Sequence, residues 1–210
     1  MIDQINITIF SAINKYAGEI PLLDGIAIAL AEYSPYVFIA VLLYLWFFSR
    51  SDGKYSALVA GYSTITGVLI NRIITSFYFH PRPFMRNIGT NLVYHVSESS
   101  IPSDHTTFML SIAAMLIFIR STRRMGWLLF LFGFLSGVAR VFCGVHFPGD
   151  IFFSVLVSFI AASIIWALRK KLSVINNIIV NVYFSILIRK KLYTRIDHST
   201  ESIEKENTVN

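Results

Sequence analysis

Long apolar segments alternate with short polar stretches along most of the chain. The apolar segments cover about residues 26–48, 55–79, 103–119, 126–143 and 148–169. A helix that crosses a bilayer needs roughly 20 apolar residues, so each segment predicts one transmembrane helix, and Pro35 either kinks the first helix or marks its start. The pattern therefore predicts an all-α integral membrane bundle with five transmembrane helices.

The two ends of the chain have a more mixed pattern. Residues 4–18 are modestly amphipathic and fit a helix in the membrane interface, although a crossing here would raise the count to six. Residues 172–191 are apolar but interrupted by asparagines and flanked by basic clusters, which favours a helix on the cytoplasmic surface over a sixth membrane helix. Residues 192–210 are polar and predicted to be disordered. The predicted organisation is an interfacial segment over 1–20, a membrane-embedded domain over 21–171, and these two C-terminal parts.

Composition supports membrane insertion and limits the other classes of function. Of the 210 residues, 55% are hydrophobic and 14% are charged, whereas about a quarter are charged in soluble domains. The net charge of +6 comes mostly from basic residues beside apolar segments, where they set topology, so nucleic-acid binding is not expected. Cys143 is the only cysteine, which excludes an internal disulfide and a cysteine-based zinc cluster, and we expect it to be packed.

The basic residues also predict the direction in which the chain crosses the membrane. Basic turns face the cytoplasm, and the turns at 49–54, 120–125 and 169–171 are basic, with a tryptophan beside each. The opposite ends of the helices are therefore expected to face outward. Three polar clusters stand at those ends, and we call them the outer clusters: residues 80–83, 102–105 and 139–150.

Arg82 and Arg140 place cations in two of the outer clusters. One isolated arginine at a membrane end commonly reaches for the lipid headgroups. Two arginines on the same face, each near a histidine, favour a ligand instead, because one guanidinium group can donate two parallel hydrogen bonds to two oxygens of a phosphate. These residues predict a site for a phosphate-bearing ligand. Arg72, inside the second predicted helix, either supports that site or reaches for headgroups.

Two histidines could supply the chemistry at such a site. Asp150 follows His146 by four residues, across a Pro-Gly pair at which a helix can start. Asp150 could then accept from one ring nitrogen of His146 and leave the other as a nucleophile; the alternative is a polar cap. Ser103 is expected to cap a helix, whose free N–H groups favour phosphate. His105, in the first turn, could protonate a leaving group.

Together these residues predict phosphoryl transfer. Two arginines and a helix start bind the phosphoryl group, one histidine attacks it in line, and a second protonates the departing oxygen. The chain has no carboxylate cluster of the magnesium-binding type, so we expect neither a metal nor another cofactor. His80 and His95 also lie on the outer side, and we interpret them as solvated loop residues rather than as catalytic groups.

The outer clusters resemble the three-part signature of the type 2 phosphatidic acid phosphatase superfamily, over about residues 55–170. Its parts are Lys-x6-Arg-Pro, then Pro-Ser-Gly-His, then Ser-Arg-x5-His-x3-Asp. The matching residues in this chain are Arg82-Pro83, Pro102-Ser103-Asp104-His105, and Arg140, His146 and Asp150 with their spacing intact.

Three positions depart from that signature. Thr75 stands where the first part has lysine, and Arg72, one turn earlier, is a candidate replacement. Asp104 replaces glycine, and Ala139 replaces serine. Thr75 therefore weakens the resemblance for the first part only, and the matching arginines and histidines are in place.

The resemblance implies a haloperoxidase-like helical core and a role for each matching residue. His146 would be the nucleophile that forms a phosphohistidine, Asp150 would orient it, and His105 would be the acid. The resemblance implies that Arg82, Arg140 and Ser103 bind the substrate. We also include Asp104 and Arg72 among the expected substrate-binding residues.

The Pro-Ser-Asp-His form, with His-Pro-Arg-Pro-Phe before it, is similar to bacterial undecaprenyl-diphosphate phosphatases linked to bacitracin resistance. The similarity implies hydrolysis of undecaprenyl diphosphate to undecaprenyl phosphate on the outer, periplasmic side of a bacterial cell membrane, recycling the cell-wall lipid carrier. The lipid and the membrane are the expected partners, with no obligate protein partner. Two alternatives stay open: a broader phosphatase for phosphatidate, phosphatidylglycerophosphate or diacylglycerol diphosphate, and a transporter or non-catalytic phospholipid-binding membrane protein.

Overall fold

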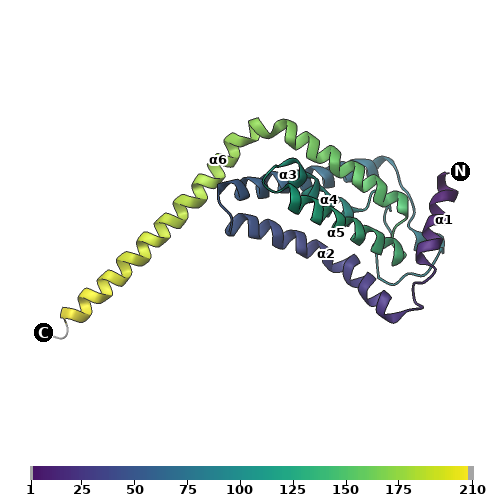
Figure 1. Cartoon of the computed structure of the whole chain (residues 1–210), viewed down its shortest axis with the longest axis horizontal. Coiled ribbons are helices and arrows are strands. Elements are labelled where there is room, and N and C mark those ends of the chain that lie inside the picture. Colours follow the sequence, from purple (N-terminus) through teal and green to yellow (C-terminus); the bar gives the residue numbers. More distant parts are fainter. Residues whose placement is uncertain (1, 208–210) are drawn as a thin grey trace. The chain divides into compact units, whose positions relative to one another are not determined.

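The computed structural model describes the backbone of residues 2–207 and the side chains of residues 3–186. Over this part, the chain forms helices and loops without strands (Figure 1), which confirms the predicted all-α fold. Its contacts divide it into one unit over Met1–Arg169 and a second over Lys170–Asn210, and each is described by itself. The helices are α1 (Ile2–Asn14), α2 (Pro21–Phe47), α3 (Ser51–Phe77), the 3-10 helix η1 (Pro83–Arg86), α4 (Asp104–Phe118), α5 (Arg123–Phe142) and α6 (Pro148–Asn207).

The lengths of the helices agree with a protein that crosses the membrane several times. Among the described residues, four helices are long and apolar enough to span a bilayer, namely α2, α3, α5 and the part of α6 up to Ile186. The remaining predicted span, over 103–119, is α4, which has 15 residues and so measures about 22 Å, less than the roughly 30 Å of a hydrocarbon core. The protein is therefore a multi-pass membrane protein whose shortest apolar helix is α4.

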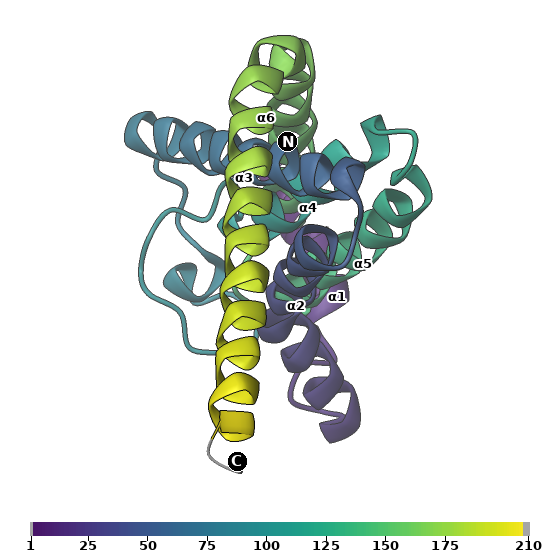
Figure 2. The same cartoon turned by 90° about the vertical axis from the view of Figure 1, so that its left-hand side faces the viewer.

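Helix α4 is the centre of the first unit. It lies between α3 and α5 and contacts both (Figure 2), and nearly all of its residues are buried. Two serines of α6 anchor its beginning, because Ser154 Oγ donates to Ser103 O at 3.2 Å and Ser158 Oγ donates to Thr107 O at 3.3 Å. These bonds set the position of the polar residues that begin α4.

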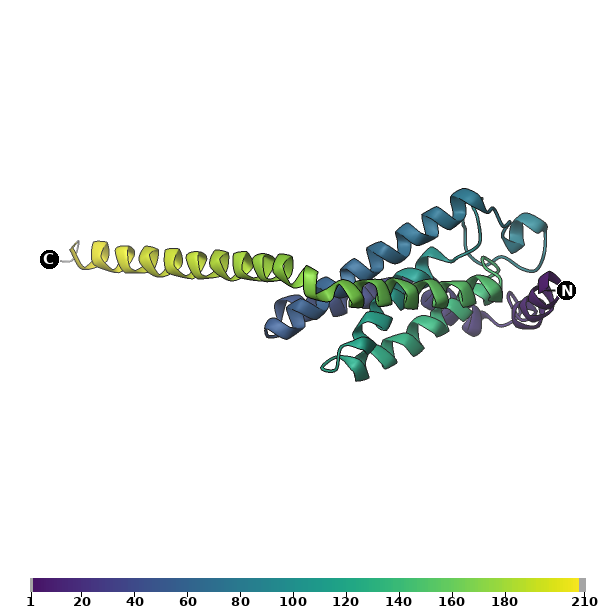
Figure 3. The same ribbon diagram turned by 90° about the horizontal axis from the view of Figure 1, so that it is seen from above.

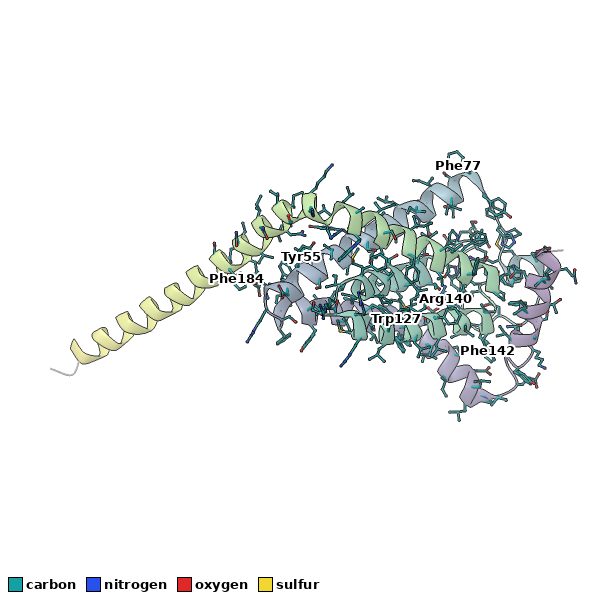
Figure 4. The ribbon with its side chains drawn as sticks, turned by 45° about the horizontal axis from the view of Figure 1, so that its top comes forward. Tyr55, Phe77, Trp127, Arg140, Phe142 and Phe184 are labelled. Atoms are coloured by element: carbon teal, nitrogen blue, oxygen red, sulfur yellow. The ribbon has the colours of Figure 1, made fainter. Side chains whose placement is uncertain are left out.

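The two ends of this helical bundle carry different chemistry. The α2–α3 and α4–α5 turns lie at one end, whereas α1, η1 and the α5–α6 turn lie at the other (Figure 3). Trp127 and Phe142 mark these two ends on α5 (Figure 4). The basic turns at 49–54 and 120–125 are thus separated from the outer clusters by the length of the bundle, whereas residues 169–171 lie within α6 and not in a turn. Which end faces the cell exterior stays a prediction.

Helix α1 closes the end of the bundle that holds the outer clusters. Phe10 is fully buried there, and the side chain of Asn14 joins three segments. Its Nδ2 donates to Thr90 O at 2.8 Å and to Phe142 O at 2.6 Å, and its Oδ1 accepts the N–H of Thr90 at 2.7 Å. The amphipathic segment at the N-terminus therefore fastens the loop after η1 to the end of α5.

The α5–α6 turn depends on Gly144. This residue has a φ of +80°, and a Cβ here would lie 2.3 Å from Thr90 O. A positive φ is easy for glycine and strained for other residues. Gly144 thus lets the chain reverse between Arg140 and His146 while the Thr90 loop packs against it.

The second unit consists of the later part of α6. The described backbone is helical through Asn207, although the sequence predicts disorder over 192–210. Residues 193–207 include no proline or glycine, and they include three glutamates and one lysine, which are favourable in helices. The domain boundaries, the disordered tail over 192–210 and the membrane placement of 172–191 stay predictions.

Candidate active site

His146 and Asp150 form a buried pair at the junction of α5 and α6. Neither residue is more than 1% exposed, and His146 Nδ1 lies 3.3 Å from Asp150 Oδ2. The same oxygen accepts the N–H of Phe147 at 2.7 Å and the hydroxyl of Ser100. These two donors thus fix the Asp150 carboxylate in position to accept the hydrogen of His146 Nδ1.

The contacts of the ring select one tautomer of His146. Arg82 Nη1 lies 3.0 Å from His146 Nε2, and a guanidinium can only donate, so Nε2 carries the lone pair. Burial lowers the pKa of His146 well below its ordinary value; the hydrogen bond to Asp150 opposes this shift, and the charge of Arg140 adds to it. His146 is therefore neutral near pH 7, and its lone pair faces a guanidinium group.

Arg82 reaches His146 from the loop between α3 and η1. The side chain is buried, and besides His146 it donates to Val145 O and Glu98 Oε1, both at 3.1 Å. Its Nε is buried with no hydrogen-bond partner in the described part of the chain. Burial lowers the pKa of Arg82 and Glu98 opposes that shift, but an arginine stays charged at neutral pH. A fixed positive group therefore stands at Nε2 of His146.

Arg140 lies inside the bundle on α5 (Figure 4) and is 0% exposed. Its Nη1 donates to Ala31 O at 3.0 Å and lies 3.5 Å from Glu32 Oε1. Its Nε and Nη2 have no hydrogen-bond partner within residues 3–186. Its charge acts on His146 and His105. Buried donors without partners are rare in native proteins, so these atoms indicate an anionic ligand.

Pro35 explains why the carbonyl of Ala31 is available to Arg140. Pro35 lies inside α2, and proline has no N–H to give to the carbonyl four residues earlier, which is that of Ala31. The unused carbonyl oxygen accepts from Arg140 instead. The helix thus continues through Pro35 rather than starting there, and the proline contributes an acceptor that positions a buried cation.

Replacing Pro35 with alanine is expected to weaken phosphate binding without unfolding the protein. The new N–H competes with Arg140 for the carbonyl of Ala31, at a cost of about 1 kcal/mol, or roughly fivefold in affinity. The measurement is the inhibition constant of orthovanadate, with thermal denaturation as the check on folding. Pro21→Ala, at the start of the same helix, is the matched control. An unchanged constant would show that Ala31 does not position Arg140.

The start of α4 lies close enough to Arg82 and Arg140 for its Asp104 and His105 to interact with their charges. Ser103 caps the helix as predicted, because its Oγ accepts the N–H of Thr106 at 3.4 Å. Thr106 Oγ1 donates to the same oxygen at 3.1 Å, so the hydroxyl hydrogen of Ser103 is left for another acceptor. His105, in the first turn, interacts electrostatically with Arg140 and Arg82. A phosphate held by the arginines would therefore lie near His105.

Asp104 connects the start of α4 to α3. Asn71 Nδ2 donates to Asp104 Oδ1 at 2.8 Å, and Arg72 Nη2 lies 3.6 Å from Asp104 Oδ2. Thr75, at the position of the signature lysine, donates to Arg72 O within its own helix. The cation that α3 brings toward the site is therefore Arg72, through Asp104.

His80 and His95 lie against the His146–Asp150 pair, and interpreting them as solvated is wrong. His80 Nδ1 lies 3.8 Å from Asp150 Oδ1, and its side chain is 17% exposed. The rings of His95 and His146 have centroids 6.3 Å apart, and the side chain of His95 is 15% exposed. The loop over 84–101 folds back onto the helices, so its polar composition did not indicate exposure.

Three residues of the site were missed from the sequence. Ser100 donates to Asp150, Glu98 accepts from Arg82, and Glu32 pairs with a buried arginine. Ser100 and Glu98 come from a loop without helical or strand periodicity, which gave no signal. Glu32 did give one, because a carboxylate inside a predicted membrane helix is costly and indicates a functional role.

The structure brings all the predicted site residues to one end of the bundle. Direct contacts join Arg82, His146 and Asp150. The others are joined to these by charge interactions or through α4: Arg140, His105, Asp104, Ser103 and Arg72.

Comparison with known proteins finds similar chains among membrane phosphatases. The family model described as PAP2 superfamily matches residues 56–173. Undecaprenyl-diphosphatase BcrC of Bacillus subtilis (strain 168) is 33% identical over 183 residues, covering 87% of this chain and 94% of that relative. Bacitracin transport permease protein BcrC of Bacillus licheniformis is 27% identical, covering 84% and 86%. The crystal structure of Aquifex aeolicus LpxE has a TM-score of 0.65 at 25% identity, covering 78% of this chain and 95% of that chain.

Proposed function

The chain belongs to the PAP2 superfamily, and from that premise we propose that it removes the terminal phosphate of undecaprenyl diphosphate through a phosphohistidine on His146. That the protein is a membrane lipid phosphatase follows from the family and the apolar helices. One observation carries the proposal: Arg82, which contacts a neutral histidine oriented by Asp150, and Arg140, whose charge acts on the same histidine, both have buried N–H groups without a partner among the described residues. The product, undecaprenyl phosphate, returns to the cell-wall lipid cycle and so supports bacitracin resistance.

The first half of the proposed reaction transfers the phosphoryl group to the enzyme. His146 Nε2 attacks the terminal phosphorus, and the bond from phosphorus to the bridging oxygen breaks on the opposite side. His105, which takes up a proton when the negatively charged diphosphate binds beside it, gives that proton to the departing oxygen, and undecaprenyl phosphate leaves. Asp150 accepts from Nδ1–H of His146 and stabilises the positive charge that develops on the ring.

The second half returns the enzyme to its starting state. His105, now without its proton, takes a proton from a water molecule, which attacks the phosphohistidine. The bond from phosphorus to Nε2 breaks, orthophosphate leaves, and His146 is neutral again. Throughout both halves, Arg82, Arg140 and Ser103 bind the phosphate oxygens, whose charge is greatest in the transition state.

The orientation in the membrane is part of the proposal. The basic turns lie at the end of the bundle opposite His146, and basic turns face the cytoplasm. The site then opens on the outer side, where a polyprenyl diphosphate is released after its sugar cargo has been transferred. Labelling single cysteines introduced at 94 and 121 of a Cys143→Ser variant with a membrane-impermeant reagent tests this orientation, because Tyr94 and Ser121 are both exposed and only the first is expected to react in intact cells.

Purified protein in detergent is expected to release one orthophosphate per undecaprenyl diphosphate, at an unchanged rate when a metal chelator is present. The catalytic groups in the proposed reaction are side chains of the protein, so chelation removes none of them. The same assay with phosphatidate, phosphatidylglycerophosphate and diacylglycerol diphosphate, in matched detergent, measures the substrate preference. Faster turnover of one of these lipids would identify the broader phosphatase, and lipid binding without phosphate release would identify a non-catalytic binder.

A further inference from the structure

Arg72 is a cation inside a membrane helix whose place there needs an explanation. It lies on α3, between one and two turns before the helix ends at Phe77, and its side chain is 66% exposed. Charged residues in membrane helices are costly and usually mark a functional path or a partner. The partner in this structure is Asp104, 3.6 Å away in the first turn of α4.

Asn71 positions the Asp104 carboxylate through the oxygen that does not face Arg72. Asn71, which is fully buried, donates to Asp104 Oδ1 at 2.8 Å and accepts from Thr107 Oγ1 at 3.4 Å. Asp104 also interacts electrostatically with Arg82 and Arg140. Asn71 and Asp104 therefore hold Arg72 beside the phosphate site while leaving most of its side chain accessible.

An apolar groove of about 360 Å³ opens beside Asp104, and although Arg72 does not line it, Val68, one turn earlier on α3, does. Asp104 and His105 form its polar part, and the rest is lined by residues of α2, α3 and α4: Glu32, Pro35, Tyr36, Ile39, Val68 and Phe108. A group that leaves in line moves away from the nucleophile and toward the acid that protonates it. With His146 as nucleophile and His105 as acid, the leaving group lies in this groove. A larger groove of about 1160 Å³ lies beside Asp150 and includes Arg86 and Asp3, but not His105.

We propose that Arg72, oriented by Asp104 and Asn71, binds the phosphate that stays on the lipid and so makes the enzyme prefer lipid diphosphates to lipid monophosphates. This inference rests on the proposed function. When the bridging bond of a diphosphate breaks, the departing lipid phosphate gains negative charge, which a nearby guanidinium stabilises. A lipid monophosphate leaves as an alcohol and presents no phosphate to Arg72. Asp104 in place of the signature glycine therefore supplies an orienting carboxylate for a diphosphate-specific arginine.

The simpler explanation is a surface ion pair in which Arg72 only neutralises Asp104. Three variants separate the two: Arg72→Gln, Asp104→Asn and the double variant. If Arg72 only neutralises Asp104, the double variant should recover activity on diphosphates, because no unpaired carboxylate remains. If Arg72 binds the second phosphate, the double variant should stay impaired. Arg86→Gln is the matched control, because Arg86 also pairs with a carboxylate, that of Asp3 at 3.0 Å, but lines the other groove.

The test compares kcat/KM for farnesyl diphosphate and farnesyl phosphate, which carry the same tail and differ by one phosphate. Arg72→Gln is expected to lower the value for the diphosphate about ten- to one-hundred-fold, as for loss of a charge-assisted hydrogen bond. The value for the monophosphate and the inhibition constant of orthovanadate should change less than about threefold. Arg72→Lys should restore part of the loss, and Arg86→Gln should leave both values unchanged.

Two results would overturn the inference. One is an equal change for both substrates in Arg72→Gln, and the other is full recovery of diphosphate activity in the double variant. A failure of the proposed function looks different, because the wild-type protein would then hydrolyse neither ester.

Discussion

Replacing His146 with glutamine is expected to lower the rate of phosphate release from a lipid diphosphate by about 10⁴-fold or more. The amide accepts a hydrogen bond from Arg82, as Nε2 does now, but it does not form a covalent bond to phosphorus. Water would then have to attack directly, without an activated nucleophile. The measurement is orthophosphate release by purified variant and wild type under saturating lipid.

The control for His146→Gln is binding, since Arg82 and Arg140 remain. The variant should bind undecaprenyl diphosphate and orthovanadate within about tenfold of the wild type and melt at a similar temperature. A variant that binds the lipid but retains more than about one hundredth of the wild-type rate would refute the assignment of His146 as nucleophile.

Asp150→Asn is expected to lower the rate by about 10³- to 10⁴-fold, because it disturbs the tautomer of His146. The carboxylate accepts from Nδ1 of His146, the N–H of Phe147 and the hydroxyl of Ser100. An asparagine amide group turned toward the ring would favour a hydrogen on Nε2, which removes the lone pair that attacks phosphorus. The rate of phosphate release, with ¹⁵N chemical shifts of labelled histidine, measures both the loss and its cause.

Asp150→Asn also removes a buried charge, so folding has to be checked separately. Thermal denaturation and the binding of orthovanadate show whether the phosphate site is intact. A folded variant with nearly wild-type activity would mean that Asp150 supports the α6 start, through the N–H of Phe147, without orienting the nucleophile.

The chain order explains why the fold and much of the site could be predicted from the sequence. Successive membrane helices alternate in direction, so the end of α3, the start of α4 and the α5–α6 turn must lie at the same end of the bundle. The family match over residues 56–173 confirms the resemblance read from these segments. The roles of His105, His146 and Asp150 within that family remain proposals that the experiments above test.

The parts of the site that were not predicted from the sequence depend on contacts between distant residues, which no local sequence pattern indicates. Ser100 and His95 belong to a loop without periodicity, and their positions come from its folding onto α5 and α6. Pro35 was visible, but its effect appears only where Arg140, about a hundred residues later, meets the carbonyl of Ala31. Glu32 was the exception, since a carboxylate in an apolar segment could have been singled out from the sequence alone.

The stereochemical course at phosphorus tests the central claim, which is that His146 carries the phosphoryl group between two in-line displacements. A lipid diphosphate made chiral at its terminal phosphorus with sulfur and oxygen isotopes is hydrolysed in isotopically labelled water, and the configuration of the released thiophosphate is determined. Each displacement inverts phosphorus, so two predict net retention. Net inversion would mean that water attacks the lipid diphosphate directly, which contradicts the phosphohistidine mechanism.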